Sequence, residues 1–194
     1  MPSLEARRRP TARQRALLAE LEALFLAEGF AVFTLDDIAA RLRCSKSTLY
    51  ALAPSKEQLA VKVVTQFFRG AAERIEERIA GIDDAPKLIG EYLAGVAEHL
   101  NRASATFMRD IAEFAPARET YQVNSRFAAK RLRQFIDLGV ADGVFRDVQA
   151  RLVAEMTGLI IEGIQTGVLG QRTEVSDAEA FTALGELLLG GLNK

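Results

Sequence analysis

Several side chains in the first third of the sequence have the types and spacing needed to contact DNA. An ammonium group such as that of Lys46 can donate to guanine O6 and N7, and the serine and threonine hydroxyls around it can reach several base edges. Tyr50 and Lys56 suit phosphate oxygens at the sides of a groove. The predicted contact residues are Thr34, Ser45, Lys46, Ser47, Thr48, Tyr50, Ala51 and Lys56.

Two short helices are expected to position these side chains. Thr34 and Asp37 have the spacing of a capping box for a helix over 35–42, and Ser45 can cap a second helix over 46–52. Two short helices separated by a tight turn are typical of a helix-turn-helix, in which the second helix enters the major groove. Capping signals alone also fit a helical hairpin buried in an all-α core.

The rest of the chain also predicts helices, because apolar residues recur at helical spacing and no sustained two-residue alternation occurs. Thr11 with Gln14 and Ser55 with Gln58 mark two further helix starts. The sequence therefore predicts an all-α fold. The expected helices cover 12–28, 35–42, 46–52, 56–80, 85–101, 104–114, 117–141, 148–169 and 177–191.

Charge is distributed unevenly along the chain. Residues 1–70 contain 11 Lys and Arg against 7 Asp and Glu, whereas residues 71–194 contain 14 against 19. A basic end suits contact with phosphates. The run Arg7-Arg8-Arg9 is expected to be a flexible arm, either solvated or in weak contact with DNA. One cysteine, and apolar segments interrupted by carboxylates, favour a cytoplasmic protein with no membrane span.

The segment FTLDDIAARLRCSKSTLY at 33–50, followed by PSKEQL at 54–59, resembles the N-terminal domain of the TetR family of bacterial regulators. Arg43 stands where the family usually has glycine, so strain is expected if this residue needs a positive φ. The resemblance implies a DNA-binding domain over 1–55. A long fourth helix would join it to a ligand-binding and dimerisation domain of five or six helices over 56–194.

The same resemblance implies a repressor that binds a palindromic, double-stranded DNA operator as a homodimer. A small, largely apolar ligand would release it. The alternative is a DNA-binding regulator controlled by its own abundance or by a protein partner. Apolar faces and small residues on the last two predicted helices favour an interface built from both of them. The predicted interface residues are Leu152, Leu159, Ile160, Ile164, Gly167, Leu184, Leu188 and Leu192.

Bulky apolar residues of the middle helices, with a few polar ones, are candidates for the wall of a ligand cavity. At helical spacing the same residues also fit an ordinary core. Asn101 and Glu162 are further polar candidates. The predicted pocket residues are Phe68, Tyr92, His99, Phe107, Met108, Ile111, Tyr121, Met156 and Gln165.

An enzyme is the rival class, but the sequence has no glycine-rich phosphate loop, nucleophile motif or metal-ligand cluster. No catalytic residue, metal or cofactor is therefore predicted. Cys44 is expected to be a small buried hydrophobe. The alternative is a redox switch whose thiolate is stabilised by Arg43 and Lys46.

Overall fold

The computed structural model describes residues 11–145 and 150–192, which form α-helices and no β-strand. The predicted all-α fold is thus confirmed. The N-terminal helices are α1 (Ala12–Glu28), α2 (Leu35–Arg41), α3 (Lys46–Tyr50) and α4 (Lys56–Ile79). The remaining helices are α5 (Ala85–Leu100), α6 (Ala105–Glu113), α7 (Ala115–Ala141), α8 (Ala150–Gln165), α9 (Val168–Thr173) and α10 (Asp177–Leu192).

The predicted helix starts are confirmed by their caps. Thr11 and Thr34 each form a complete capping box, in which the cap hydroxyl and the third helical residue satisfy each other's backbone N–H groups. Ser45 and Ser55 accept from the backbone N–H groups of Thr48 and Gln58. These local hydrogen bonds fix where the helices around the turn begin.

The single helix predicted over 148–169 is wrong. In the described part of this range, α8 ends at Gln165, and Gly167 adopts a left-handed conformation with φ 73°. Glycine takes this conformation without a Cβ clash, so it can end one helix and start another in a new direction. Residues 168–173 form the separate short helix α9, and 148–149 lie outside the described residues.

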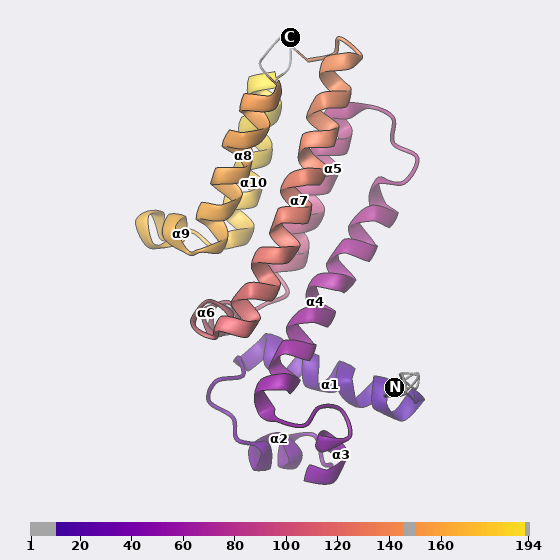
Figure 1. Cartoon of the computed structure of the whole chain (residues 1–194), viewed down its shortest axis with the longest axis vertical. Helices are drawn as coiled ribbons and strands as arrows, with labels where there is room; N and C mark the ends of the chain where they lie inside the picture. The colour runs from indigo at the N-terminus through magenta and orange to yellow at the C-terminus, as the bar shows by residue number, and fades with distance from the viewer. Residues whose placement is uncertain (1–10, 146–149, 193–194) are drawn as a thin grey trace, which may run out of the picture.

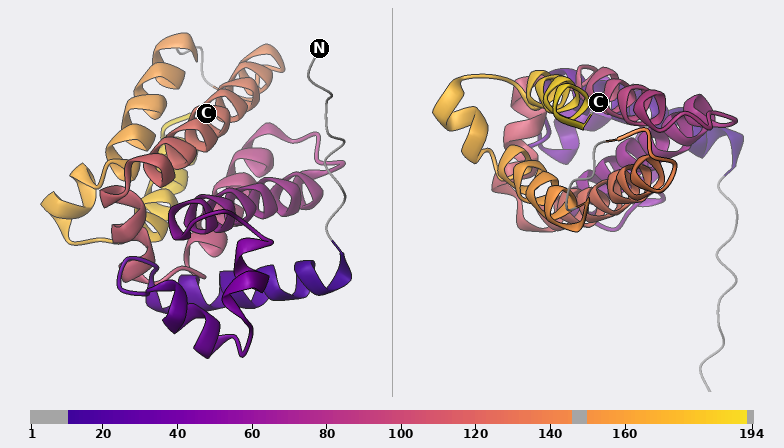
Figure 2. Two further views of the ribbon diagram at one scale, coloured as in Figure 1. Left: turned by 60° about the horizontal axis from the view of Figure 1, so that its bottom comes forward. Right: turned by 90° about the horizontal axis from the view of Figure 1, so that it is seen from above.

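The helices form two connected groups (Figure 1). Helices α1 to α3 lie together at one end, and α4 runs from them into the rest of the molecule. Helix α4 packs on α5 and α7, while α10 packs on α5 and α7 on α8. Seen along the long axis, α4, α5, α7, α8 and α10 lie around a common centre (Figure 2, right).

One hydrophobic core runs through both groups, and α4 contributes to it along its length. Leu59 and Val63, near the start of α4, are fully buried, as is Phe67 in its middle. Ile75 is buried further along the same helix. The predicted division at residues 55 and 56 therefore stays a prediction, because a shared helix rather than a linker joins the two parts.

Candidate nucleic-acid interface and internal cavity

The start of α3 presents polar side chains to solvent. Leu49 is completely buried and anchors the helix on the core, while Lys46 and Ser47 are exposed. The Ser45 hydroxyl lies 2.7 Å from that of Ser47 and 2.8 Å from that of Thr48. Tyr50 is 51% exposed, and Ala51 follows it at the surface. The residues predicted on this helix are thus accessible at its start, Lys46 and Ser47, and at its end, Tyr50 and Ala51.

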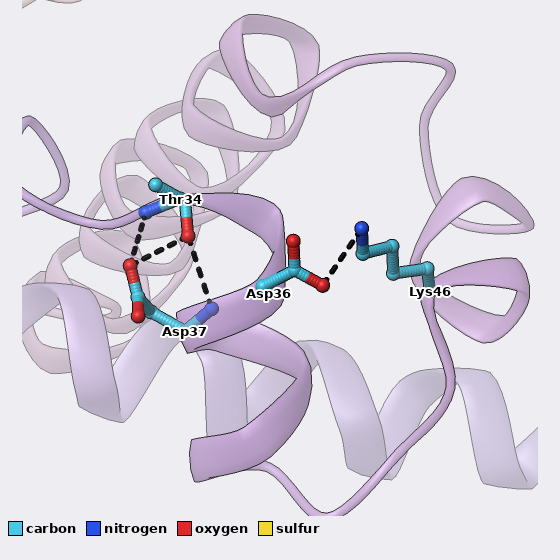
Figure 3. A network of polar contacts seen from close by, with 4 residues as sticks. All are labelled: Thr34, Asp36, Asp37 and Lys46. Carbon is cyan, nitrogen blue, oxygen red and sulfur yellow. Dashed lines mark hydrogen bonds and ion pairs between the residues drawn. The ribbon is translucent and has the colours of Figure 1, made fainter.

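Two acidic residues at the start of α2 complete this surface, as Figure 3 shows. The carboxylate of Asp37 accepts from the backbone N–H of Thr34 at 2.8 Å and from its hydroxyl at 2.6 Å. Asp36 instead reaches across to α3, where its Oδ1 lies 2.7 Å from Nζ of Lys46. This hydrogen bond raises the pKa of Lys46 above its usual value. Our sequence interpretation missed Asp36, because no local spacing indicates a contact between these two helices.

Two further lysines of this part bind backbone carbonyls. Nζ of Lys56, at the start of α4, donates to the carbonyl of Ala31 at 2.7 Å. Nζ of Lys62 donates to the carbonyl of Leu52 at 2.9 Å. Lys56 thus holds the connection between α1 and α2 while remaining partly exposed.

The same connection is bound from the other side by Asp110 of α6. Its buried Oδ2 accepts from the backbone N–H of Phe30 at 2.6 Å and of Ala31 at 2.8 Å. Gly29, with φ 80°, allows the approach, since a Cβ there would lie 2.5 Å from Oδ2. The position of α1 and α2 is therefore tied directly to α6.

The turn between α2 and α3 shows the expected strain, because Arg43 has φ 49°. Cys44 is half-buried beside it. Burial, and then the charge of Glu20, raise the pKa of the Cys44 thiol despite the opposing charge of Arg13. The raised pKa disfavours the alternative of a thiolate stabilised by Arg43 and Lys46, and the half-buried thiol agrees better with the expected packing role.

A cavity of about 320 Å³ lies between α4, α5, α7 and α10, with Gln165 of α8 at its edge. Of the predicted pocket residues, Phe68, Tyr92, His99, Tyr121 and Gln165 line it. Missed residues include Asn124, Ser125 and Ala128, which share one face of α7 with Tyr121. Their helical spacing from Tyr121 could have indicated them as pocket residues.

Four predicted pocket residues lie elsewhere. Phe107 and Ile111 of α6 are fully buried, and the ring of Phe107 packs edge-on against those of Phe30 and Phe67. Met108 packs partly buried against the same core. Met156 is 55% exposed on α8, so it faces away from the interior. Asn101 and Glu162 border other surface hollows.

His99 is a polar group buried at the wall of the cavity. Its Nδ1 lies 2.9 Å from a guanidinium nitrogen of Arg74 and 3.4 Å from one of Arg102. Among the described residues, its Nε2 is the single buried side-chain nitrogen or oxygen without a hydrogen-bond partner. Burial, then Arg74 and Arg102, lower the pKa of His99 to about 4. His99 is therefore neutral at neutral pH.

This lowered pKa makes stability depend on pH. Between pH 6.5 and pH 4 the unfolded chain binds a proton at His99 that the folded chain does not. The free energy of unfolding should therefore be highest above pH 6.5 and fall by at most about 3 kcal/mol as the pH approaches 4. Urea unfolding of the wild type and of His99→Gln across this range measures the difference. Parallel pH profiles for the two proteins would contradict the expectation.

Two tyrosines of the cavity wall are also held in their neutral form. Burial raises the pKa of Tyr92, and burial together with Asp177 raises that of Tyr121. The Tyr121 hydroxyl donates to Asp177 at 2.8 Å, and its ring stacks on Phe68 with centroids 4.8 Å apart. The cavity wall is thus aromatic, with a few fixed hydrogen-bonding groups.

The predicted interface residues divide into two groups. Ile164, Leu184, Leu188 and Leu192 are buried within the chain itself, so their assignment to an intersubunit surface is wrong. They cover the interior because α8 and α10 each turn one apolar face toward their neighbours. Leu152 and Leu159 are 54% and 68% exposed, while Ile160 and Gly167 are half-buried. Leu152, Met156 and Leu159 follow one face of α8 at helical spacing.

Other kinds of site find no support in the part of the chain that the structure describes. Within residues 11–145 and 150–192, no three His, Cys, Asp or Glu side chains group in a way that could hold a metal ion. None of the helices described there has the length and apolar character needed to cross a membrane.

These features define an all-α protein with a helix-turn-helix at its N-terminal end. Residues 17–63 match the model of bacterial regulatory proteins of the tetR family. The helix-turn-helix transcriptional regulator YvaF of Bacillus subtilis is 49% identical over 53 residues, which cover 27% of each chain. Residues 17–63 are thus similar to the N-terminal part of the tetR family, and the match to this curated relative spans about a quarter of its length.

Solved structures share the whole fold. A transcriptional regulator from Saccharomonospora viridis in complex with choline superimposes with a TM-score of 0.69 at 19% identity, covering 94% of this chain and 98% of its own. The TetR family regulator PfmR from Thermus thermophilus has a TM-score of 0.64 at 21% identity, with 92% and 99% covered. At these identities the likeness concerns the arrangement of helices.

Proposed function

We propose that this protein is a DNA-binding transcriptional regulator that represses its target genes from a palindromic operator. The observation that carries the proposal is the exposed start of α3, where Lys46 and neighbouring hydroxyls stand clear of a buried anchor, Leu49. A helix presented in this way can enter the major groove and contact base edges. The matched family region over 17–63 includes this helix. Activity as a cytoplasmic regulator rather than an enzyme is part of the same proposal.

A second copy of the chain would complete the regulator. One helix-turn-helix makes few contacts, and two related by a two-fold axis bind the half-sites of a palindrome. The exposed apolar face of α8, formed by Leu152, Met156 and Leu159, is our candidate for the contact between copies. Helix α10 lies beside α8 (Figure 1) and exposes Leu187, so both helices can contribute to a four-helix interface.

Ligand control is supported by the path of α4. The helix begins with Lys56 beside the DNA-binding part, and its residues Phe68, Ala71 and Ile75 line the cavity. A molecule in the cavity that favours a tilted α4 would change the separation of the two recognition helices in a dimer. The choline complex of the Saccharomonospora viridis protein supports the idea that this fold can hold a small molecule.

The experiment that tests DNA binding is selection of bound duplexes from a random library, followed by affinity measurement on the enriched sequence. Lys56→Ala should weaken binding to enriched and scrambled duplexes alike and reduce the salt dependence by about two units of slope, because each subunit of the dimer loses one phosphate contact. Lys87→Ala, an exposed lysine at the start of α5, is the matched control. An unchanged slope for Lys56→Ala would count against its phosphate contact. Failure to enrich any sequence would overturn the proposal.

Ligand control predicts reciprocal binding. A compound found by its increase of the melting temperature of the free protein should bind about 5- to 150-fold more weakly when operator DNA is present. Calorimetric titration with and without the duplex measures both affinities. Equal affinities would show that the compound is not an inducer. If no apolar compound binds, control by abundance or by a protein partner becomes the better explanation.

A further inference from the structure

We propose that Asp36 is a positioning residue that makes Lys46 selective for one base pair and prevents it from acting as a general phosphate contact. The inference rests on the proposed function, namely that α3 enters the major groove. It concerns which base pairs α3 prefers and does not concern whether the protein binds DNA. Its basis is the contact between the two helices shown in Figure 3.

The first step is the geometry of the pair. Lys46 is the first residue of α3, and its long side chain would lose much rotational freedom on contacting a base. The 2.7 Å contact with Asp36 already holds its Nζ in place. An ammonium group has three N–H donors. One donor serves Asp36, and the two that remain match the two acceptors of guanine, O6 and N7.

The second step is that the fold does not need Asp36 for capping. The capping box of α2 is complete with Thr34 and Asp37. The side chain of Asp36 is 73% exposed, and within the described residues Lys46 is the one cation at ion-pair distance from it. The first turn of α2 favours a carboxylate through the helix dipole, whereas a surface that faces phosphates disfavours one. The contact with Lys46 gives this carboxylate a charged partner on that surface.

The third step concerns DNA of the wrong sequence. Nonspecific binding depends on lysines and arginines that neutralise phosphates and release counterions. The carboxylate of Asp36 partly offsets the positive charge of Lys46 and repels nearby phosphates. Asp36 should therefore weaken nonspecific binding while leaving Lys46 oriented for a guanine. The specificity is the ratio of the affinity for the operator to the affinity for other DNA. Both effects of Asp36 should increase this ratio.

Asp36→Asn tests this inference because it removes the charge and keeps the shape. Affinities are measured across salt concentration on the duplex enriched with wild-type protein and on a scrambled duplex of the same composition. We expect tighter binding to the scrambled duplex, a salt slope steeper by about two units there because both subunits carry the change, and a specificity ratio lowered about three- to tenfold. Repeated selection with the variant should show a weaker preference at one base pair of each half-site.

Two controls make the result specific to the pair. Glu57→Gln removes an exposed carboxylate from the first turn of α4, and it should leave the preference at that base pair unchanged. In a Lys46→Ala background, Asp36→Asn should no longer alter the preference. The inference is overturned if wild type and Asp36→Asn select with equal preference, or if Glu57→Gln has the same effect. No enrichment by the wild type would instead reject the proposed function itself.

Discussion

Asp110→Ala is expected to lower the free energy of unfolding by about 2–4 kcal/mol and to weaken operator binding in parallel. The substitution leaves two backbone N–H groups, those of Phe30 and Ala31, without their carboxylate acceptor. The buried N–H of Phe30, left unsatisfied, costs about 1–3 kcal/mol, and the part-buried N–H of Ala31 costs less because water can reach it. The connection between α1 and α2 would also lose its attachment to α6. Chemical unfolding and DNA titration of the same variant measure the two effects.

Asp110→Asn is the matched variant, because its amide oxygen can accept the same hydrogen bonds without the charge. It should lose about half as much stability, since bonds to a charged acceptor are about twice as strong as neutral ones. Asp137→Ala, an exposed aspartate of α7, should change stability little. If Asp110→Ala unfolds at the wild-type denaturant concentration, the contact between α6 and the N-terminal part is unimportant for stability.

Leu159→Glu is expected to separate the proposed dimer into folded single chains. Leu159 is 68% exposed in the single chain, so glutamate is tolerated there. Across a two-fold axis, however, two buried carboxylates would face an apolar surface, and the desolvation cost of several kcal/mol per ion weakens the dimer at least about 100-fold. Sedimentation measures the mass, and circular dichroism shows whether the fold is retained. Operator affinity should fall with the dimer.

Two comparison variants locate the effect. Val32→Glu changes another exposed apolar residue, which is 74% exposed beside α2, and it should leave the dimer intact. Leu188→Glu places a charge at a position that is 7% exposed within the chain, and it should unfold the protein rather than dissociate it. An intact dimer of Leu159→Glu would place the contact between copies on another surface.

Local signals in the sequence were sufficient for most of the fold. The caps at Thr11, Thr34 and Ser45 act through hydrogen bonds to residues three positions away, which a sequence displays directly. The break at Gly167 was missed because glycine also occurs inside helices, and only the path of the chain decides which role it takes. Local chemistry therefore predicted where helices begin better than where α8 ends.

The sites were predicted less completely, because they depend on contacts between distant segments. The side chains at the start of α3 follow from one short motif, so the structure places them together as expected. The salt bridge of Lys46 with Asp36 depends on the crossing of two helices. Leu188 and Leu159 are both leucines on helices with apolar faces, yet Leu188 is buried within the chain while Leu159 is exposed to solvent. Helical periodicity identifies a face without saying what covers it.

The continuous core along α4 has a consequence for how the protein loses its structure. Leu59 and Val63 pack at the DNA-binding end of this helix, and Ile75 packs at the other end. Neither half can therefore melt while the other keeps its full set of contacts, and no exposed hinge separates them. The proposed DNA-binding part and the proposed ligand-binding part are therefore expected to unfold as one cooperative unit. Heating that disrupts packing anywhere along α4 is expected to unfold both parts together.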